Sequence, residues 1–164
     1  MRVLGIDPGF AICGWGIVDA EGSSLKHINH GVILTTTDMR FQDRLVKIKN
    51  DLQDILTLYK PDEIAFEELF FARNVTTALT VGAARGCAVT VAAEYTDKLY
   101  EYTPMEVKQA IVGYGRAEKF QIQQMVKMLL NLQDIPKPDD AADALAVAVT
   151  HANAGYAREH FRMK

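Results

Sequence analysis

The first part of the chain alternates short apolar runs with turn signals. Residues 3–6 and 12–18 are rich in β-branched and aromatic side chains and are separated by Pro8-Gly9, which predicts two strands joined by a turn. Residues 25–34 follow the polar turn Glu21-Gly-Ser-Ser24 and predict a third strand. We expect these three strands to pair as an antiparallel meander.

The pattern then changes to helices that alternate with strands. Apolar side chains recur at helical spacing over residues 41–59, and Pro61 ends this predicted helix. Further strands are predicted at residues 63–66 and 99–102. Further helices are predicted at residues 74–93 and 117–130, a third begins at the Thr103-Pro-Met-Glu106 capping box, and the last follows Pro138. This order predicts an α/β fold with a five-stranded mixed sheet, in which a three-stranded antiparallel meander joins two parallel strands, flanked by helices.

Length and composition fit one globular domain. The chain has 164 residues, nearly half of them apolar, and we expect a single domain over residues 1–154. The polar tail, residues 155–164, shows no core pattern and is a candidate for disorder. Cys13 and Cys87 lie inside apolar runs and are expected to be reduced core residues.

Charge and targeting signals set further bounds. The formal net charge of −3 counts against a protein that binds nucleic acid through its overall charge, although basic residues gather locally. The N-terminus lacks the long apolar region of a signal peptide, and we see no uninterrupted apolar run long enough to cross a bilayer. We therefore expect a cytoplasmic protein without a membrane partner.

Four carboxylates stand at the edges of apolar segments that should be buried. Asp7 and Glu67 each end an apolar run, while Asp140 and Asp143 open a third one. An unpaired carboxylate is costly to bury, so such residues need a compensating charge. A carboxylate cluster neutralised by divalent cations is one such arrangement, and it points to phosphoryl-transfer chemistry.

Each carboxylate also has a structural explanation. Asp7 before Pro-Gly is ordinary turn chemistry, and Asp140 and Asp143 could favour a helix N-terminus, with Asp139 competing for the cap position. Strand alternation lets only one of Glu67 and the following Glu68 join a cluster. If strands one and four are neighbours, however, Asp7 and Glu67 lie side by side at strand ends, where α/β sheets place their ligands. The joint placement favours the functional interpretation.

The helix predicted at residues 74–93 contains Gly82-Ala-Ala-Arg-Gly86. Two glycines four positions apart on one helical face permit close approach of another backbone, and each weakens the isolated helix. Tight packing on the domain's own sheet and a subunit interface both explain this pattern.

Four segments in a fixed order carry a resemblance to a known family. They are Gly5-Ile-Asp-Pro-Gly9, Ala65-Phe-Glu-Glu-Leu-Phe70, Gln109-Ala-Ile-Val-Gly-Tyr-Gly115 and Asp140-Ala-Ala-Asp-Ala-Leu-Ala146. The first segment alone is weak, since actin-like and sugar-kinase folds open similarly. Together the segments resemble the RuvC family of Holliday-junction resolvases, in the ribonuclease H-like superfamily, over all but about the last ten residues.

The resemblance implies an enzyme that resolves four-way DNA junctions by paired symmetric nicks in homologous recombination and DNA repair. It implies that Asp7, Glu67, Asp140 and Asp143 hold two Mg²⁺ ions, with Mn²⁺ as a substitute, for hydrolysis that leaves 5′-phosphate and 3′-hydroxyl ends. The resemblance also implies that Lys119 is catalytic and acts near the scissile phosphate, where its positive charge could stabilise the transition state. The implied DNA-binding residues are Phe70, Phe71, Arg73, Lys108, Arg116 and Lys119, with Phe70 as the wedge and Phe71 as a second candidate.

The same resemblance implies a homodimer with the helix near Gly82 and Gly86 at its interface, and a complex with the branch-migration proteins RuvA and RuvB. Two-fold symmetry would present two equivalent sites to a roughly two-fold junction. Glu68, often glutamine in relatives, and Asp139 are additional acids that the resemblance does not explain.

Three alternatives make different predictions. A ribonuclease H-like nuclease for structured RNA would keep the carboxylates but would have little need of an aromatic wedge or a dimer helix. An actin-like ATP-binding module needs two such domains, whereas this chain holds one. A junction-binding protein without activity would have no reason to keep all four acids.

Overall fold

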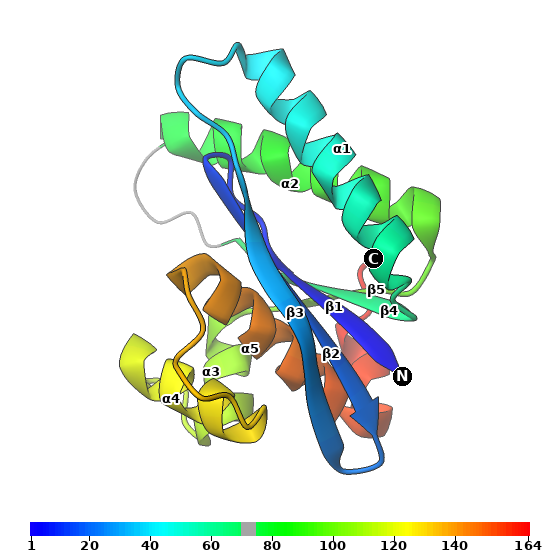
Figure 1. The fold of residues 1–164 in the computed structure, drawn as a ribbon, viewed down its shortest axis with the longest axis vertical. Helices are drawn as coiled ribbons and strands as arrows, with labels where there is room; N and C mark the ends of the chain where they lie inside the picture. The colour runs from blue at the N-terminus through cyan, green and yellow to red at the C-terminus, as the bar shows by residue number, and fades with distance from the viewer. Residues whose placement is uncertain (70–74) are drawn as a thin grey trace.

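A mixed five-stranded sheet forms the centre of the computed structural model, which describes residues 1–69 and 75–164 (Figure 1). Its strands lie in the order β3-β2-β1-β4-β5. β1 pairs antiparallel with β2 and β2 with β3, whereas β1 pairs parallel with β4 and β4 with β5. The predicted fold class is therefore confirmed, including the neighbouring positions of the first and fourth strands. The strand bounds are β1 Arg2–Asp7, β2 Ile12–Glu21, β3 Ser24–Leu34, β4 Glu63–Glu67 and β5 Leu99–Tyr102.

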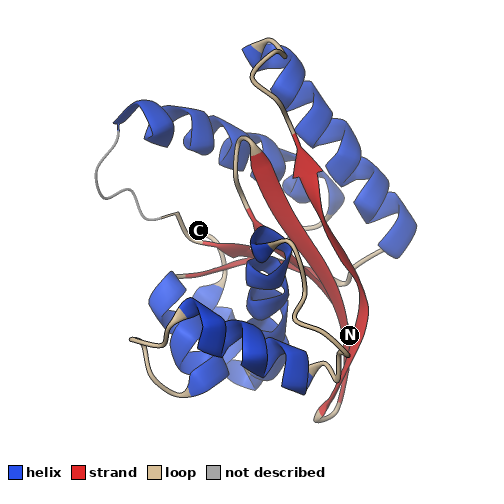
Figure 2. Ribbon diagram, turned by 60° about the vertical axis from the view of Figure 1, so that its left-hand side comes forward, coloured by secondary structure: helices blue, strands red, loops and turns tan. Residues whose placement is uncertain are grey.

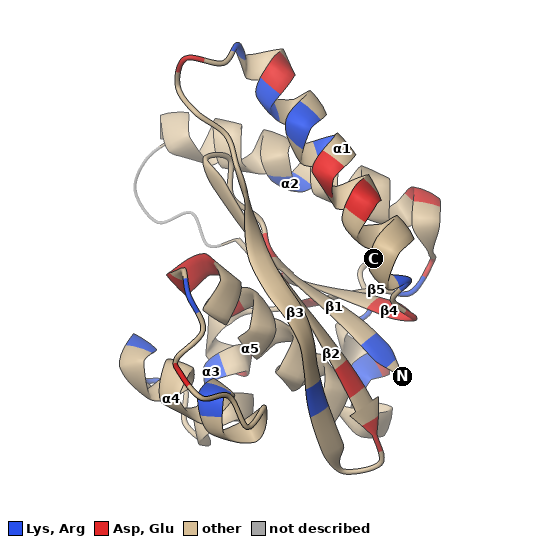
Figure 3. Ribbon diagram, viewed as in Figure 1, with Lys and Arg blue, Asp and Glu red and all other residues tan. Residues whose placement is uncertain are grey.

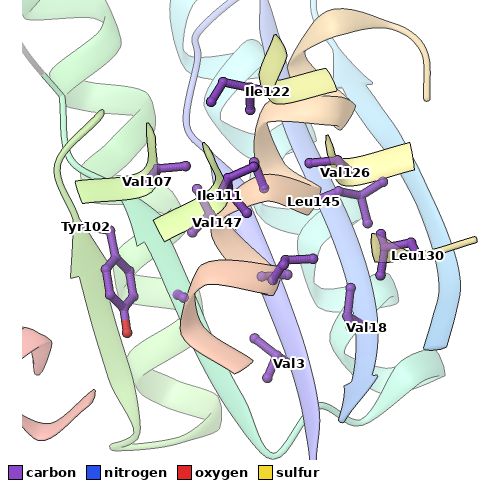
Figure 4. Close-up of a cluster of buried hydrophobic side chains, with 14 of the residues drawn as sticks. Val3, Val18, Tyr102, Val107, Ile111, Ile122, Val126, Leu130, Leu145 and Val147 are labelled. Carbon is purple, nitrogen blue, oxygen red and sulfur yellow. The ribbon is translucent and has the colours of Figure 1, made fainter. Parts of the chain in front are cut away.

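Helices cover both faces of the sheet (Figure 2). One apolar cluster joins the sheet to α1 and α2, and the other joins it to α3, α4 and α5. In the second cluster, Val107 of α3, Val126 of α4 and Leu145 of α5 lie around Val3 and Val18 of the sheet (Figure 4). The helix bounds are α1 Phe41–Tyr59, α2 Val75–Tyr95, α3 Pro104–Val112, α4 Lys119–Leu129, α5 Asp139–Asn153 and the 3₁₀ helix η1 Gly155–Phe161.

Helix α5 packs most closely on the sheet, because glycines in the strands leave room for its backbone. A Cβ atom on Gly5 of β1 would lie 2.1 Å from the carbonyl oxygen of Ala144, and one on Gly14 of β2 would lie 2.0 Å from that of Asp140. Any side chain larger than hydrogen would push the helix away. These glycines therefore set the distance between the sheet and the N-terminal turns of α5.

The capping box predicted at the start of α3 is present. The Thr103 hydroxyl accepts a hydrogen bond from the Glu106 backbone N–H at 3.2 Å, and the Glu106 carboxylate accepts one from the Thr103 N–H at 2.8 Å. Pro104 occupies the first helical turn, and Gly113 ends the helix with φ of 92°. Since β5 ends at Tyr102, the cap fixes α3 directly beside the carboxyl end of the sheet.

The C-terminal tail differs from the sequence expectation. A polar tail was a candidate for disorder, yet residues Gly155–Phe161 form η1, and the Met163 N–H donates to the Leu99 carbonyl oxygen at 2.9 Å. The ring of Phe161 lies 4.6 Å from that of the buried Tyr102. The tail is ordered through contacts with β5, and such long-range contacts leave no periodic pattern in ten residues.

Helix α2 qualifies by length and composition as a possible membrane span, contrary to the sequence expectation that none exists. It packs against α1 and buries Ala84, Ala88, Val91 and Ala92 in the core. A core helix of a water-soluble domain passes the same test, so this finding is weak evidence for a membrane.

Candidate active site at the carboxyl end of the sheet

Asp7 and Glu67 are the last residues of the neighbouring parallel strands β1 and β4. In β1, Leu4 and Ile6 belong to the apolar cluster under α1 and α2, whereas Val3 belongs to the one under α5. Alternation therefore places Asp7 on the α5 face. The same argument places Glu67 there, because Ala65 also belongs to the α5 cluster. Of the two adjacent acids, Glu67 rather than Glu68 therefore lies on the α5 face with Asp7.

Helix α5 brings the other two acids to the same place. It begins at Asp139, and Asp140 and Asp143 follow at a spacing that puts both on one helical face. The N-terminal turn of α5 carries acidic residues where it meets the sheet (Figure 3). The expectation that Asp139 could cap this helix is wrong, because Pro138 holds the cap position and no side chain caps it. Asp139 instead accepts a hydrogen bond from the Gln123 amide of α4 at 3.0 Å.

The carboxylates are close enough to perturb one another. Burial and then repulsion from Asp143 raise the pKa of Asp7 to about 6, while a hydrogen bond with Glu67 acts in the opposite sense. Burial and then Asp7 raise the pKa of Glu67 to about 8. Burial raises the pKa of Asp143 as well, against the effect of Lys119. Asp140 also contributes to the raised pKa of Asp7. All four acids therefore share one electrostatic environment with too little positive charge.

Lys119, the first residue of α4, supplies part of that charge. Its ammonium group donates to Asp143 Oδ2 at 3.0 Å and lies 3.6 Å from Asp139 Oδ2. Burial acts to lower the pKa of Lys119, but the contacts with Asp143 and Asp139 outweigh it and the pKa is raised. Lys119 is half exposed, so the ammonium group can exchange partners at the surface.

An open hollow lies over this cluster, with a volume of about 200 Å³. Its polar lining comes from Glu67, Lys108, Lys119 and Asp143, and its apolar walls from Pro104, Val107, Ile122 and Ala146. The structure thus places Lys108, a candidate DNA-binding residue, beside Glu67 and Asp143. Arg116 is exposed between α3 and α4 and lines none of the described hollows near the acids. Phe70, Phe71 and Arg73 lie outside the described residues.

The donor set fits a hard divalent cation in its chemistry. Four carboxylates offer oxygen ligands, and burial together with mutual repulsion raises the pKa values of Asp7, Glu67 and Asp143, which indicates negative charge that lacks a partner. Among the described residues, however, no three His, Cys, Asp or Glu side chains are already arranged as a complete metal-binding group. Binding a cation there would therefore require these carboxylates to rearrange.

The sequence analysis missed the apolar walls of the hollow. Pro104 and Val107 both lie on α3, whose start was predicted correctly from the capping box. The available signal was position: a helix that begins directly after β5 must begin at the same edge of the sheet as Asp7 and Glu67. That inference required the strand order, which places β4 next to β5.

Comparisons with known proteins agree with this geometry. Residues 3–151 match the family described as crossover junction endodeoxyribonuclease RuvC. A protein of that name from Alkaliphilus oremlandii (strain OhILAs) is 56% identical over 164 residues, which cover 100% of both chains.

Solved structures give the same result. The RuvC structure of Thermus thermophilus has a TM-score of 0.87 and 37% identity, covering 98% of each chain. The structure of T. thermophilus RuvC in complex with a Holliday junction substrate has a TM-score of 0.86 and 35% identity, covering 94% of each chain. With a family match over most of its length, a relative of this identity and this site at the end of its sheet, the chain belongs to the RuvC family of crossover junction endodeoxyribonucleases.

Proposed function

We propose that this protein resolves four-way DNA junctions by hydrolysing two phosphodiester bonds at symmetric positions, in homologous recombination and DNA repair. The observation that supports this most strongly is that Glu67 and Asp143 line one hollow beside Lys119 while Asp7 interacts with both of these acids. The T. thermophilus relative that binds a Holliday junction has the same fold over 94% of this chain.

The cofactor in this proposal is a pair of Mg²⁺ ions, for which Mn²⁺ can substitute. Asp7, Glu67, Asp140 and Asp143 would hold them, and the ions would supply an activated water and charge stabilisation at the leaving 3′-oxygen. The expected products carry 5′-phosphate and 3′-hydroxyl ends. The raised pKa values of Asp7 and Glu67 support a cation at this position, because a bound cation, like a proton, would offset both the burial of these carboxylates and the repulsion between them.

Lys119 has a separate role in the proposal. Its ammonium group pairs with Asp143 at 3.0 Å, and a cation would displace it from that carboxylate. A lysine released at the rim of the hollow can donate to a non-bridging oxygen of the scissile phosphate, where negative charge increases in the transition state. The exchange of partners would couple metal binding to phosphate binding.

The DNA surface extends from the hollow along α3. Lys108 lines the hollow, and neither Lys108 nor the exposed Arg116 forms an ion pair with a described residue. Both cations are therefore available to backbone phosphates, which supply most of the affinity for DNA. Phe70, Phe71 and Arg73 follow the carboxyl end of β4, and we propose that one aromatic ring opens the junction by stacking on a base.

We also propose a homodimer formed through α2. An added Cβ atom on Gly82 or Gly86 would meet nothing within 4 Å, so these glycines do not serve packing on the domain's own sheet. They lie on an exposed face with Val75, Leu79, Thr90 and Ala93, which carries no charge. This favours a subunit interface over internal packing for the small-residue helix. From its membership of the RuvC family, we also propose that the protein acts in a complex with RuvA and RuvB and that it is cytoplasmic.

A substrate comparison tests the proposed function. The protein is given equal concentrations of three substrates in Mg²⁺: a synthetic four-way junction, the matching linear duplex and an RNA–DNA hybrid. We expect the junction to be cut by far the fastest. Equal cleavage of all three would instead support a general ribonuclease H-like nuclease.

A further inference from the structure

A second hollow adjoins the active site and remains unexplained by the cleavage chemistry. It has a volume of about 430 Å³ and is lined by Thr103, Pro104, Met105, Lys108 and Gly115. Pro104 and Lys108 also line the hollow over the carboxylates, so the two spaces share a wall. The volume lies within the range of about 300–1,000 Å³ that is usual for small-ligand sites.

Met105 gives this second hollow its apolar character. The side chain is 66% exposed and belongs to neither buried core cluster, although α3 buries Val107 and Ile111. The capping box fixes the backbone of Met105 in the first turn of α3. Gly115 leaves room for the side chain, because a Cβ atom there would lie 2.8 Å from Met105 Cγ. An exposed thioether between a capped helix and a glycine is well placed to contact a ligand.

The charges around the second hollow favour a phosphate-bearing ligand. Lys108 lies on its wall and has no acidic partner in the part of the chain that the structure describes. None of the five residues that line it is acidic, in contrast to the carboxylate hollow next door. A nucleotide matches both properties, since it combines a flat apolar base with a phosphate that Lys108 can neutralise.

We propose that Met105 and Pro104 seat the nucleobase of a nucleotide that directly flanks the scissile phosphate, so that Met105 helps to determine which sequence context is cut. This inference rests on the proposed function, because it takes the scissile phosphate to lie at the carboxylates. The methionine sulfur makes favourable contacts with aromatic rings, and modest sequence preferences can arise without hydrogen-bond readout of the base. A preference set this way depends on base size and stacking strength.

The test compares Met105→Ala with Met128→Ala. Met128 lies on α4, is 70% exposed and lines neither hollow, so it is a control of matched exposure. Single-turnover cleavage is measured on a junction that wild type cuts, and on two versions with an abasic nucleotide on one or the other side of the cut. We expect Met105→Ala to slow cleavage of the intact junction about three- to tenfold, and Met128→Ala to leave it unchanged.

The abasic junctions identify the contact. At one of the two flanks, loss of the base should slow cleavage by wild type by a similar factor. On the same abasic junction, Met105→Ala should cut little more slowly than wild type, because the contact is already lost. Equal rates for wild type and Met105→Ala, or fully additive effects at both flanks, would overturn the inference. Failure of wild type to cut the intact junction would overturn the proposed function instead, so the two failures are distinguishable. Circular dichroism confirms that the exposed substitution leaves the fold intact.

Discussion

At the scale of single residues, the positions of Asp7 and Glu67 could be predicted from the sequence, whereas the contact between Lys119 and Asp143 could not. Asp7 and Glu67 were predictable because each ends an apolar run, and parallel pairing of β1 and β4 brings their ends together. The contact between Lys119 and Asp143 joins residues 24 positions apart, and it depends on how α4 packs against α5. No local pattern encodes such a contact, and here the family resemblance supplied Lys119.

Replacing Asp7 with asparagine should separate catalysis from binding. The change removes a proposed metal ligand but leaves the basic residues of the DNA surface in place. We expect cleavage in Mg²⁺ to fall below detection while junction affinity, measured by gel mobility shift in Ca²⁺ or without metal, changes less than threefold. Asp54→Asn, on the exposed face of α1, is the control. Loss of folding in Asp7→Asn would contradict a mainly catalytic role.

The raised pKa of Glu67 predicts how stability depends on pH without metal. The folded protein holds the proton on Glu67 more tightly than the unfolded chain does. The stability that this proton contributes is therefore fully present below about pH 4.5 and is lost as pH rises through about 8. Glu67→Gln removes the penalty, so its melting temperature should exceed that of wild type by a few degrees at pH 8 and not at pH 5.

Thermal melts in EDTA at both pH values measure this difference. Adding Mg²⁺ at pH 8 should raise the melting temperature of wild type and have little effect on Glu67→Gln. A pH-independent difference between the two proteins would mean that the carboxylate is not destabilised by its neighbours.

At the scale of elements, two glycine pairs have opposite roles that composition alone does not distinguish. A Cβ atom added to Gly5 or Gly14 would lie about 2 Å from a backbone oxygen of α5. A Cβ atom added to Gly82 or Gly86 of α2 would meet nothing within 4 Å. All four occur in predicted strands or helices, and none of their neighbours in sequence reveals which face is covered. The capping box of α3, by contrast, was predictable because all its contacts lie within four residues.

Gly5→Ala should destabilise the protein and misplace the acids of α5. The added methyl would overlap the Ala144 carbonyl, and overpacking of this kind costs about 1–3 kcal/mol or more. Gly82→Ala should not destabilise the protomer, because alanine is favoured in helices and meets no neighbour there. Urea unfolding of both variants at low protein concentration gives the comparison; equal free energies of unfolding would refute the close-packing argument.

The exposed face of α2 predicts the effect of a charge on assembly. Leu79 on this face and Leu58 on α1 are 72% and 70% exposed, so glutamate at either position costs the protomer little. We expect Leu79→Glu to convert a dimer into monomers in sedimentation velocity, with Leu58→Glu remaining dimeric. If both variants sediment as wild type does, α2 is not the interface.

At the scale of the whole molecule, the order of elements predicted the layered sheet well, because three strands before alternating helices and strands leave few right-handed arrangements. The tail was not predictable, since it is ordered by contacts with β5 that lie about 60 residues away in the sequence. Net charge was also uninformative, because four of the 21 acids that lower it belong to the site itself. The fold gathers these acids at one edge and leaves cations on α3 and α4 beside them (Figure 3).

The most direct test of this account is cleavage of a synthetic four-way junction, with strand mapping, as a function of divalent cation. We predict nicks at symmetric positions in two opposing strands with Mg²⁺ or Mn²⁺, complete loss of cleavage in EDTA and recovery when Mg²⁺ is restored. Cleavage that persists in EDTA would show that the gathered carboxylates of β1, β4 and α5 are not a cation-dependent active site.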